Sequence, residues 1–253
     1  VPTTAGTGSE VTPVAVITTG ETTKAGVSSP VLLPDVAVLD AALTLGLPPA
    51  VTAMTGVDAM VHAIEAYTSR HKKNPLSDSL AIHALQLLSR NIRTAVLEGS
   101  NQQARENMLL GACLAGQAFA NAPVAAVHAL AYPLGGHYHI PHGLSNSLVL
   151  PSVLEFNAPE ASALYAELAE VVIGASVAGS IEAKTAALIA ALRELIADVA
   201  LPATLQLAGV KEQDLELLAS DAMLQQRLLV NNPRDVAYED ALAIYQAAYG
   251  AVA

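Results

Sequence analysis

The feature that most constrains the fold of this chain is a polar pair, Asp58 and His62, inside the largely apolar run from Thr55 to Tyr67. In a helix, residues i and i+4 lie on one face about one turn apart, which is the spacing of a metal-ligating pair. A buried carboxylate–imidazole hydrogen bond without a metal also explains an isolated pair. Because polar groups inside an apolar helix need partners, the rest of the chain must bring other groups to this face.

A histidine-rich segment provides such partners. Four of the seven histidines fall between Val127 and Gly143, in the sequence Val-His-Ala-Leu-Ala-Tyr-Pro-Leu-Gly-Gly-His-Tyr-His-Ile-Pro-His-Gly. A polar cluster in apolar surroundings requires an explanation, and a bound metal ion supplies one. Carboxylate and imidazole ligands without a thiolate suit Fe²⁺ or Zn²⁺ better than a soft ion or Ca²⁺.

The Asp-x-x-x-His pair and two later histidines, the second in a Pro-His-Gly turn, resemble the iron-dependent (group III) alcohol dehydrogenases. The resemblance covers nearly the whole chain and is most specific in the two segments described above. It implies that four residues hold one divalent ion, iron or zinc: Asp58, His62, His128 and His142. It also implies a mainly α fold, in which a multihelical, dehydroquinate synthase-like domain follows a β remnant of a Rossmann-like α/β domain.

The function implied by the resemblance is NAD(P)-dependent oxidation of a small alcohol, or reduction of its aldehyde. Members of the family carry a nucleotide-binding domain ahead of a threonine-rich stretch, and this chain begins with Val1 inside that stretch, so we expect an N-terminally truncated chain. Two alternatives stay open. One is a metal-free enzyme similar to maleylacetate reductase, and the other is a non-catalytic, metal-stabilised helical module.

Candidate cofactor contacts lie at the N-terminus. Thr3, Thr4 and Thr7, with two neighbouring glycines, offer hydroxyl and backbone N–H groups to a pyrophosphate or nicotinamide. An ordinary turn explains the same residues, since the motif is not a G-x-G-x-x-G. The resemblance places these threonines in the cofactor cleft and matches Lys24 to a lysine that faces the cofactor. Without the resemblance, we would interpret Lys24 as a solvated charge at the surface.

Tyr132 departs from the family pattern, because many members have a histidine there that is assigned to proton transfer. A tyrosine with an ordinary pKa near 10 donates a hydrogen bond but is a poor base at neutral pH. Either Tyr132 takes over the proton step, or the proton leaves through His137, His139 or water, or the substrate differs from the short diols used by the histidine-bearing members. Plain packing of Tyr132 is the alternative to a catalytic role. Glu65, one turn beyond His62, either accepts a hydrogen bond from a ligand imidazole or lies exposed.

Hydrophobic patterning predicts two strands, Val11–Ile17 and Val31–Leu39, followed by helices. Asp40 is expected to cap the next element, and a domain boundary between Asp40 and Pro48 divides the chain into residues 1–46 and 47–253. The expected helices are Pro48–Thr68, Leu76–Leu97, Asn101–Ala120, Val124–Leu134, Gly143–Phe156, Pro159–Ile173, Ser180–Val199, Lys211–Ala219 and Tyr238–Tyr249, with a loop at Gly174–Gly179.

Composition limits the partners. The 253 residues are 53% hydrophobic, enough for a sizeable core, and the formal charge of −11 argues against nucleic acid or an anionic membrane surface as a partner. The single cysteine, Cys113, lies in an apolar helical run and is read as core packing, which fits a reducing cytoplasm. With no signal or membrane-spanning segment in the sequence, we expect a soluble, cytoplasmic protein. A homodimer is the expected assembly, although no residue pattern specifies it.

Overall fold

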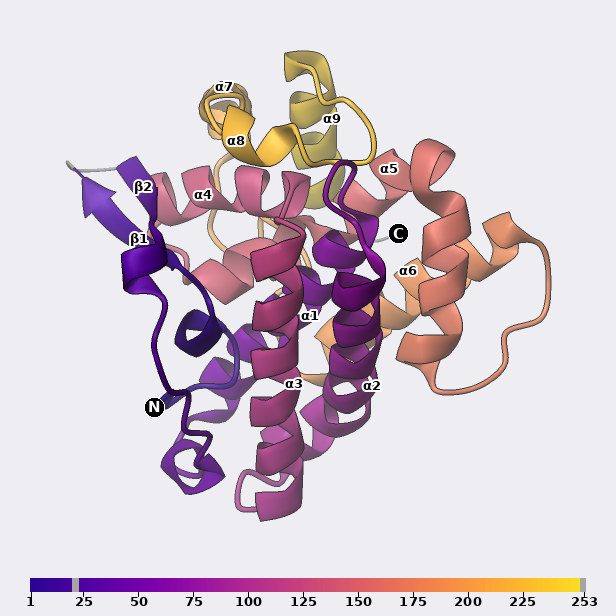
Figure 1. Ribbon diagram of the computed structural model, residues 1–253. Coiled ribbons are helices and arrows are strands. Elements are labelled where there is room, and N and C mark those ends of the chain that lie inside the picture. The colour runs from indigo at the N-terminus through magenta and orange to yellow at the C-terminus, as the bar shows by residue number, and fades with distance from the viewer. Residues whose placement is uncertain (20–22, 251–253) are drawn as a thin grey trace.

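The computed structural model describes residues 1–19 and 23–250, and the side chains of these except at positions 16, 18, 19 and 23–25. The described chain is mainly helical, as predicted (Figure 1). Its longer helices are α1 (Pro49–Thr68), α2 (Pro75–Leu97), α3 (Gln102–Asn121), α4 (Ala126–Tyr138), α5 (His142–Ile173), α6 (Ile181–Asp198) and α9 (Tyr238–Tyr249). Two short helices, α7 (Leu215–Ala222) and α8 (Gln226–Leu229), lie between α6 and α9 in the chain.

Helix α1 forms the centre of this arrangement, because α2, α3 and α5 all pack against it. Figure 1 shows α1 behind α3, with α2 running alongside. Every residue from Gly56 to Thr68 is buried, so the helix has no solvent face in its second half. A helix apolar on all sides belongs in a core, and here it carries the polar pair Asp58 and His62 into that core.

Local sequence signals explain where the helices begin. Asn74 and Ser77 form a reciprocal capping box at the start of α2, and Pro75 occupies its first turn. Asn101 and Ser180 cap α3 and α6 by accepting backbone N–H groups. These ends agree with the predicted ranges within a residue or two.

Helix α5 is longer than predicted. We expected a break between Phe156 and Pro159, but the helix runs unbroken from His142 to Ile173 with Pro159 inside it. A proline removes one backbone hydrogen bond and crowds the preceding turn. The Phe156 carbonyl in that turn accepts a hydrogen bond of 2.7 Å from Arg234 Nη1. Helix α5 packs against α1, α4, α6 and α9, and it has buried residues on both sides of the proline.

The β structure also differs from the expectation. Strand β1 (Val14–Thr19) pairs antiparallel with β2 (Thr23–Ser28), and Val14 lies opposite Ser28. The predicted strand at Val31–Leu39 was wrong. This segment begins with a 3₁₀ turn at Pro30–Leu32, continues without strand pairing, and has most of its large apolar side chains exposed. Within the described residues no strand lies beside it to accept its backbone hydrogen bonds.

Two smaller predictions are confirmed. Asp40 caps the 3₁₀ turn Ala41–Thr44, with its Oδ1 accepting from the Ala42 N–H at 3.0 Å. The loop at Gly174–Gly179 is present, and Gly174 ends α5 with φ of 75°, a left-handed conformation that favours glycine. The domain boundary near residue 46 stays a prediction.

No single described helix has both the length and the apolarity of a membrane span; only α3 and α4 taken together, across a bend of 108°, pass that test.

Candidate metal centre

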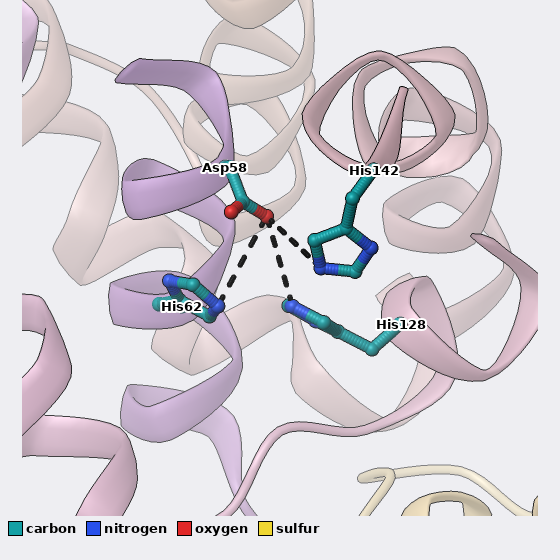
Figure 2. A group of neighbouring side chains, drawn as sticks. All are labelled: Asp58, His62, His128 and His142. Atoms are coloured by element: carbon teal, nitrogen blue, oxygen red, sulfur yellow. Dashed lines mark ion pairs between the residues drawn. The ribbon is translucent and has the colours of Figure 1, made fainter. Parts of the chain in front are cut away.

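Three helices bring the four predicted ligands together. Asp58 and His62 project from α1, His128 from the first turn of α4, and His142 is the first residue of α5 (Figure 2). One potential ligand atom from each residue lies within 4.8 Å of the others. Asp58 Oδ1 lies 4.0, 3.8 and 3.6 Å from the Nε2 atoms of His62, His128 and His142.

This donor set fits a divalent transition ion. It offers one carboxylate oxygen and three imidazole nitrogens, which are the ligands that zinc and ferrous iron accept in proteins. The side chains of Asp58, His62 and His128 are at most 6% exposed, whereas that of His142 is 45% exposed. The centre is therefore enclosed on three sides and accessible beside His142, and an accessible ligand position is typical of catalytic rather than structural sites.

The position of His142 depends on the residue that follows it. A Cβ atom added to Gly143 would lie 2.2 Å from the Met54 carbonyl oxygen and 3.3 Å from Asp58 Cβ. Only glycine therefore lets the start of α5 approach α1 this closely. The Pro-His-Gly sequence thus serves a packing purpose, since it delivers His142 to the side of α1 that carries Asp58.

Glu65 fixes the orientation of His128. Its Oε2 lies 2.6 Å from His128 Nδ1, and its Oε1 accepts the Val127 N–H at 2.7 Å. Glu65 is 4% exposed, so the alternative of a surface position is wrong. With the Nδ1–H donated to this carboxylate, the Nε2 lone pair of His128 points toward Asp58, an arrangement common among metal-bound histidines.

Asn146 also reaches the cluster. It lies one turn after His142 on α5 and is fully buried. Its Nδ2 donates to Asp58 Oδ1 at 2.5 Å and lies 3.3 Å from the Nε2 atoms of both His128 and His142. One amide nitrogen therefore lies within hydrogen-bond distance of three of the four candidate ligand atoms.

The electrostatics favour the metal-binding protonation states of Asp58 and His62, whereas the pKa of His128 shifts in the opposite direction. Burial raises the pKa of Asp58, but the three imidazoles and the Asn146 amide more than offset it and hold that pKa below its ordinary value. Burial lowers the pKa of His62 to about 3, so the imidazole is neutral at physiological pH. Burial also acts to lower the pKa of His128, but Glu65 outweighs it and raises that pKa. A metal ion requires the ionised carboxylate and the neutral imidazoles.

Tyr132 lies beside the exposed ligand. It is one turn beyond His128 on α4, and its ring centroid is 6.0 Å from that of His142. Arg227 of α8 donates to the Tyr132 hydroxyl at 3.4 Å. Burial raises the pKa of Tyr132 although Arg227 opposes the shift, so the hydroxyl stays protonated at neutral pH.

The other two histidines of the rich segment lie apart from the ligand group. His137 Nε2 is 2.6 Å from Asp221 Oδ2 of α7, an ion pair that ties the end of α4 to that helix when His137 is protonated. His139 ends α4 in the left-handed conformation, with φ of 53°, and is exposed. The predicted proton role of His137 stays a prediction.

The structure gives the positions of the four predicted cofactor residues, while their role in cofactor binding stays a prediction. Thr3 and Thr7 are exposed, and Thr7 Oγ1 donates to Ser9 Oγ at 3.1 Å, while Thr4 is half-buried. This stretch is held against α1, because Gly6 is buried where a Cβ would lie 2.7 Å from Thr55 Cβ. Lys24 lies in β2 opposite Thr18, and its side chain is outside the described part of the structure.

Neither Asn146 nor Arg227 was predicted from the sequence. For Asn146 a signal existed, since His142 and Asn146 have the same i, i+4 spacing as Asp58 and His62 and therefore share a helix face. Arg227 had no comparable signal. It is far from the histidines in sequence, and only the packing of α8 brings it to Tyr132.

The chain matches the models of two protein families. Residues 52–249 match the C-terminal part of the Fe-containing alcohol dehydrogenase family, and residues 1–41 match the iron-containing alcohol dehydrogenase model. A long-chain-alcohol dehydrogenase of Geobacillus thermodenitrificans is 46% identical over 250 residues, which are 98% of this chain and 62% of that protein. A 1,3-propanediol dehydrogenase of Klebsiella pneumoniae is 42% identical over 98% of this chain and 64% of its own length.

The fold comparison agrees. The crystal structure of a 1,3-propanediol oxidoreductase superposes with a TM-score of 0.93 at 42% identity, covering 98% of this chain and 64% of that one. The chain thus spans less than two thirds of the length of the proteins it resembles.

Proposed function

Because the chain belongs to the iron-containing alcohol dehydrogenase family, we propose that it provides the metal centre of an NAD(P)-linked alcohol dehydrogenase or aldehyde reductase. The observation that carries the proposal is the cluster of one carboxylate and three imidazoles. Asp58, His62 and His128 are buried in it, and His142 is half-exposed. Its substrates are small alcohols or aldehydes that enter beside His142.

Asp58, His62, His128 and His142 hold the ion. When bound, Fe²⁺ or Zn²⁺ acts as a Lewis acid that polarises the substrate oxygen and offsets its developing charge. Glu65 keeps the Nε2 of His128 directed to the centre, and the close contact at Gly143 keeps α5 against α1. These residues fix the ligand geometry before substrate arrives, which is how a rigid scaffold lowers the cost of reorganisation.

Tyr132 is the proposed hydrogen-bond donor to the substrate oxygen. Its hydroxyl is protonated at neutral pH, and its ring lies beside that of His142, the accessible member of the cluster. A protonated phenol gives a proton more readily than it accepts one, so this role suits reduction of an aldehyde, in which the oxygen gains a proton. Arg227 holds the hydroxyl in place and opposes the rise of its pKa.

The threonine stretch and Lys24 are the proposed cofactor contacts of this chain. NAD(P) supplies or accepts the hydride. Thr3, Thr4 and Thr7 supply hydroxyl groups near the start of α1, because Gly6 anchors their stretch to Thr55, one turn before Asp58. A metal-free function leaves the convergence of Asp58 with three histidines unexplained, so the metal-dependent reaction is favoured.

The test is metal dependence of the reaction. Protein containing this chain is assayed with primary alcohols and aldehydes and with NAD and NADP, before and after treatment with a strong chelator. We expect turnover that the chelator removes and that Fe²⁺ or Zn²⁺ restores. Turnover that persists in protein shown by mass spectrometry to be free of metal contradicts the proposal and favours the metal-free alternative.

A further inference from the structure

The buried amide of Asn146 stands among the ligand atoms but is not one of the four residues assigned to the ion. Its Nδ2 lies 2.5 Å from Asp58 Oδ1 and 3.3 Å from the Nε2 atoms of His128 and His142. Asn146 has 0% exposure, so water cannot easily replace these contacts. Asp58, His128 and Asn146 come from three different helices, and the amide is where they meet.

The chemistry of the contact fixes the amide orientation. An amide nitrogen has two hydrogens to donate, and the strongest acceptor nearby is the ionised Asp58 carboxylate, so the shortest contact is charge-assisted. The opposite orientation would place the amide oxygen 2.5 Å from a carboxylate oxygen, which is repulsive. In the observed orientation, Asn146 Oδ1 is buried with no hydrogen-bond partner among the residues described. A buried acceptor without a partner is costly, so the Nδ2 contacts must outweigh that cost.

We propose that Asn146 is a positioning residue of the metal centre, which holds Asp58 Oδ1 in register with the Nε2 atoms of His128 and His142. Without the amide, the Asp58 carboxylate is free to rotate about its side-chain bonds toward either imidazole, because His62 on its own helix is 4.0 Å away. The inference rests on the proposed metal-dependent function, since it concerns the geometry of the same ligands.

Asn157 provides a matched control. It lies on the same helix, is 3% exposed, and exchanges hydrogen bonds of 3.0 and 2.7 Å with Asn232, away from the ligands. Asn146→Ala and Asn157→Ala therefore each remove one buried amide from α5. A purely structural role predicts similar effects of the two substitutions, whereas a positioning role predicts that only Asn146→Ala affects metal binding.

The experiment measures the dissociation constant for Zn²⁺ by competition with a chromophoric chelator, and the melting temperature of each protein with and without Zn²⁺. We expect Asn146→Ala to bind Zn²⁺ about tenfold to a hundredfold more weakly, the range for residues that orient metal ligands. Its gain in melting temperature on Zn²⁺ binding should be smaller than that of the unsubstituted chain. Asn157→Ala should bind Zn²⁺ with unchanged affinity and melt earlier by the same amount in both forms.

If Asn146→Ala does not fold, Asn146→Ser is measured in its place. The serine side chain is too short for its hydroxyl to reach Asp58, so we expect the same loss of Zn²⁺ affinity. Affinity equal to that of the unsubstituted chain, in whichever variant folds, overturns the positioning role and leaves the proposed metal centre intact. Failure of the unsubstituted chain to bind any divalent ion overturns the proposed function itself, and the inference with it.

Discussion

Glu65 and His128 form a buried pair that joins α1 to α4, with 2.6 Å between Oε2 and Nδ1. The other oxygen of the same carboxylate accepts the Val127 N–H at 2.7 Å. One side chain thus fixes both the backbone at the start of α4 and the ring that this turn carries. The ligand from α4 is thereby oriented by the helix that supplies Asp58 and His62.

Replacing Glu65 by Gln should weaken metal binding about tenfold to a hundredfold. The carboxylate raises the pKa of His128, so the substitution should also lower that pKa in the metal-free protein, as followed by NMR of the imidazole. Glu167→Gln is the control, because Glu167 is exposed and accepts a hydrogen bond from the Tyr67 hydroxyl. Equal metal affinity in the two variants would show that Glu65 does not orient His128.

Replacing Gly143 by Ala should destabilise the fold by about 1–3 kcal/mol, the usual cost of forcing a methyl group into a packed interior. The new Cβ would lie 2.2 Å from the Met54 carbonyl oxygen, so α5 must move away from α1 and take His142 with it. We therefore expect metal affinity to fall as well.

Gly135→Ala is the matched control for this substitution. A Cβ at Gly135 would meet the Ile140 carbonyl oxygen at an ordinary 3.6 Å, and alanine is the better helix former. Denaturant unfolding should show no loss of stability for Gly135→Ala. A Gly143→Ala protein as stable as this control would mean that the contact between α5 and α1 is not tight.

Replacing Tyr132 by Phe should lower turnover by on the order of 10²-fold or more, as expected for loss of a general acid, while metal content stays unchanged. The raised pKa of Tyr132 means that its hydroxyl is protonated throughout the neutral range. Activity should therefore not fall through titration of Tyr132 as pH rises from about 6 to 9. A decrease of less than about threefold returns Tyr132 to packing and makes His137 the next candidate.

The thiol of Cys113 should be unreactive in the native protein. Burial, together with the nearby Glu10, raises its pKa to about 11, so little thiolate is present at pH 8. A colourimetric disulfide reagent at pH 8 should react slowly with the folded chain and rapidly with one thiol per chain in denaturant. Immediate full reaction in the native state would contradict the buried position.

Sequence patterns predicted the elements whose signals are local. The spacing of Asp58 and His62 and the apolar periodicity of the helices predicted to begin at Asn101 and Ser180 act within a few residues, and the structure has helices there. Glu65 was also accessible to this reasoning, because its place one turn from His62 already put it near a ligand. Its partner, however, is His128 on another helix, and only the fold determines that.

The predictions from sequence were wrong where contacts between distant residues override the local conformational preference of the chain. Pro159 predicts a break in isolation, but packing on several sides and the Arg234 contact maintain α5 through it. The Val31–Leu39 segment has strand-forming residues, yet a strand needs a neighbour to pair with, and the described chain offers none. Arg227 reaches Tyr132 only because α8 packs on α4, which no pattern near Arg227 indicates.

Metal content tests the proposed centre most directly. The chain, His142→Ala and His83→Ala are purified without added metal, reloaded with one equivalent of Fe²⁺ or Zn²⁺, desalted and analysed by mass spectrometry. His83 is an exposed histidine of α2, so its removal controls for the loss of any imidazole. We predict one divalent ion per chain in the unsubstituted protein and in His83→Ala, and a much lower content in His142→Ala. Equal metal content in the two variants would contradict the assignment of Asp58, His62, His128 and His142 as the ligands.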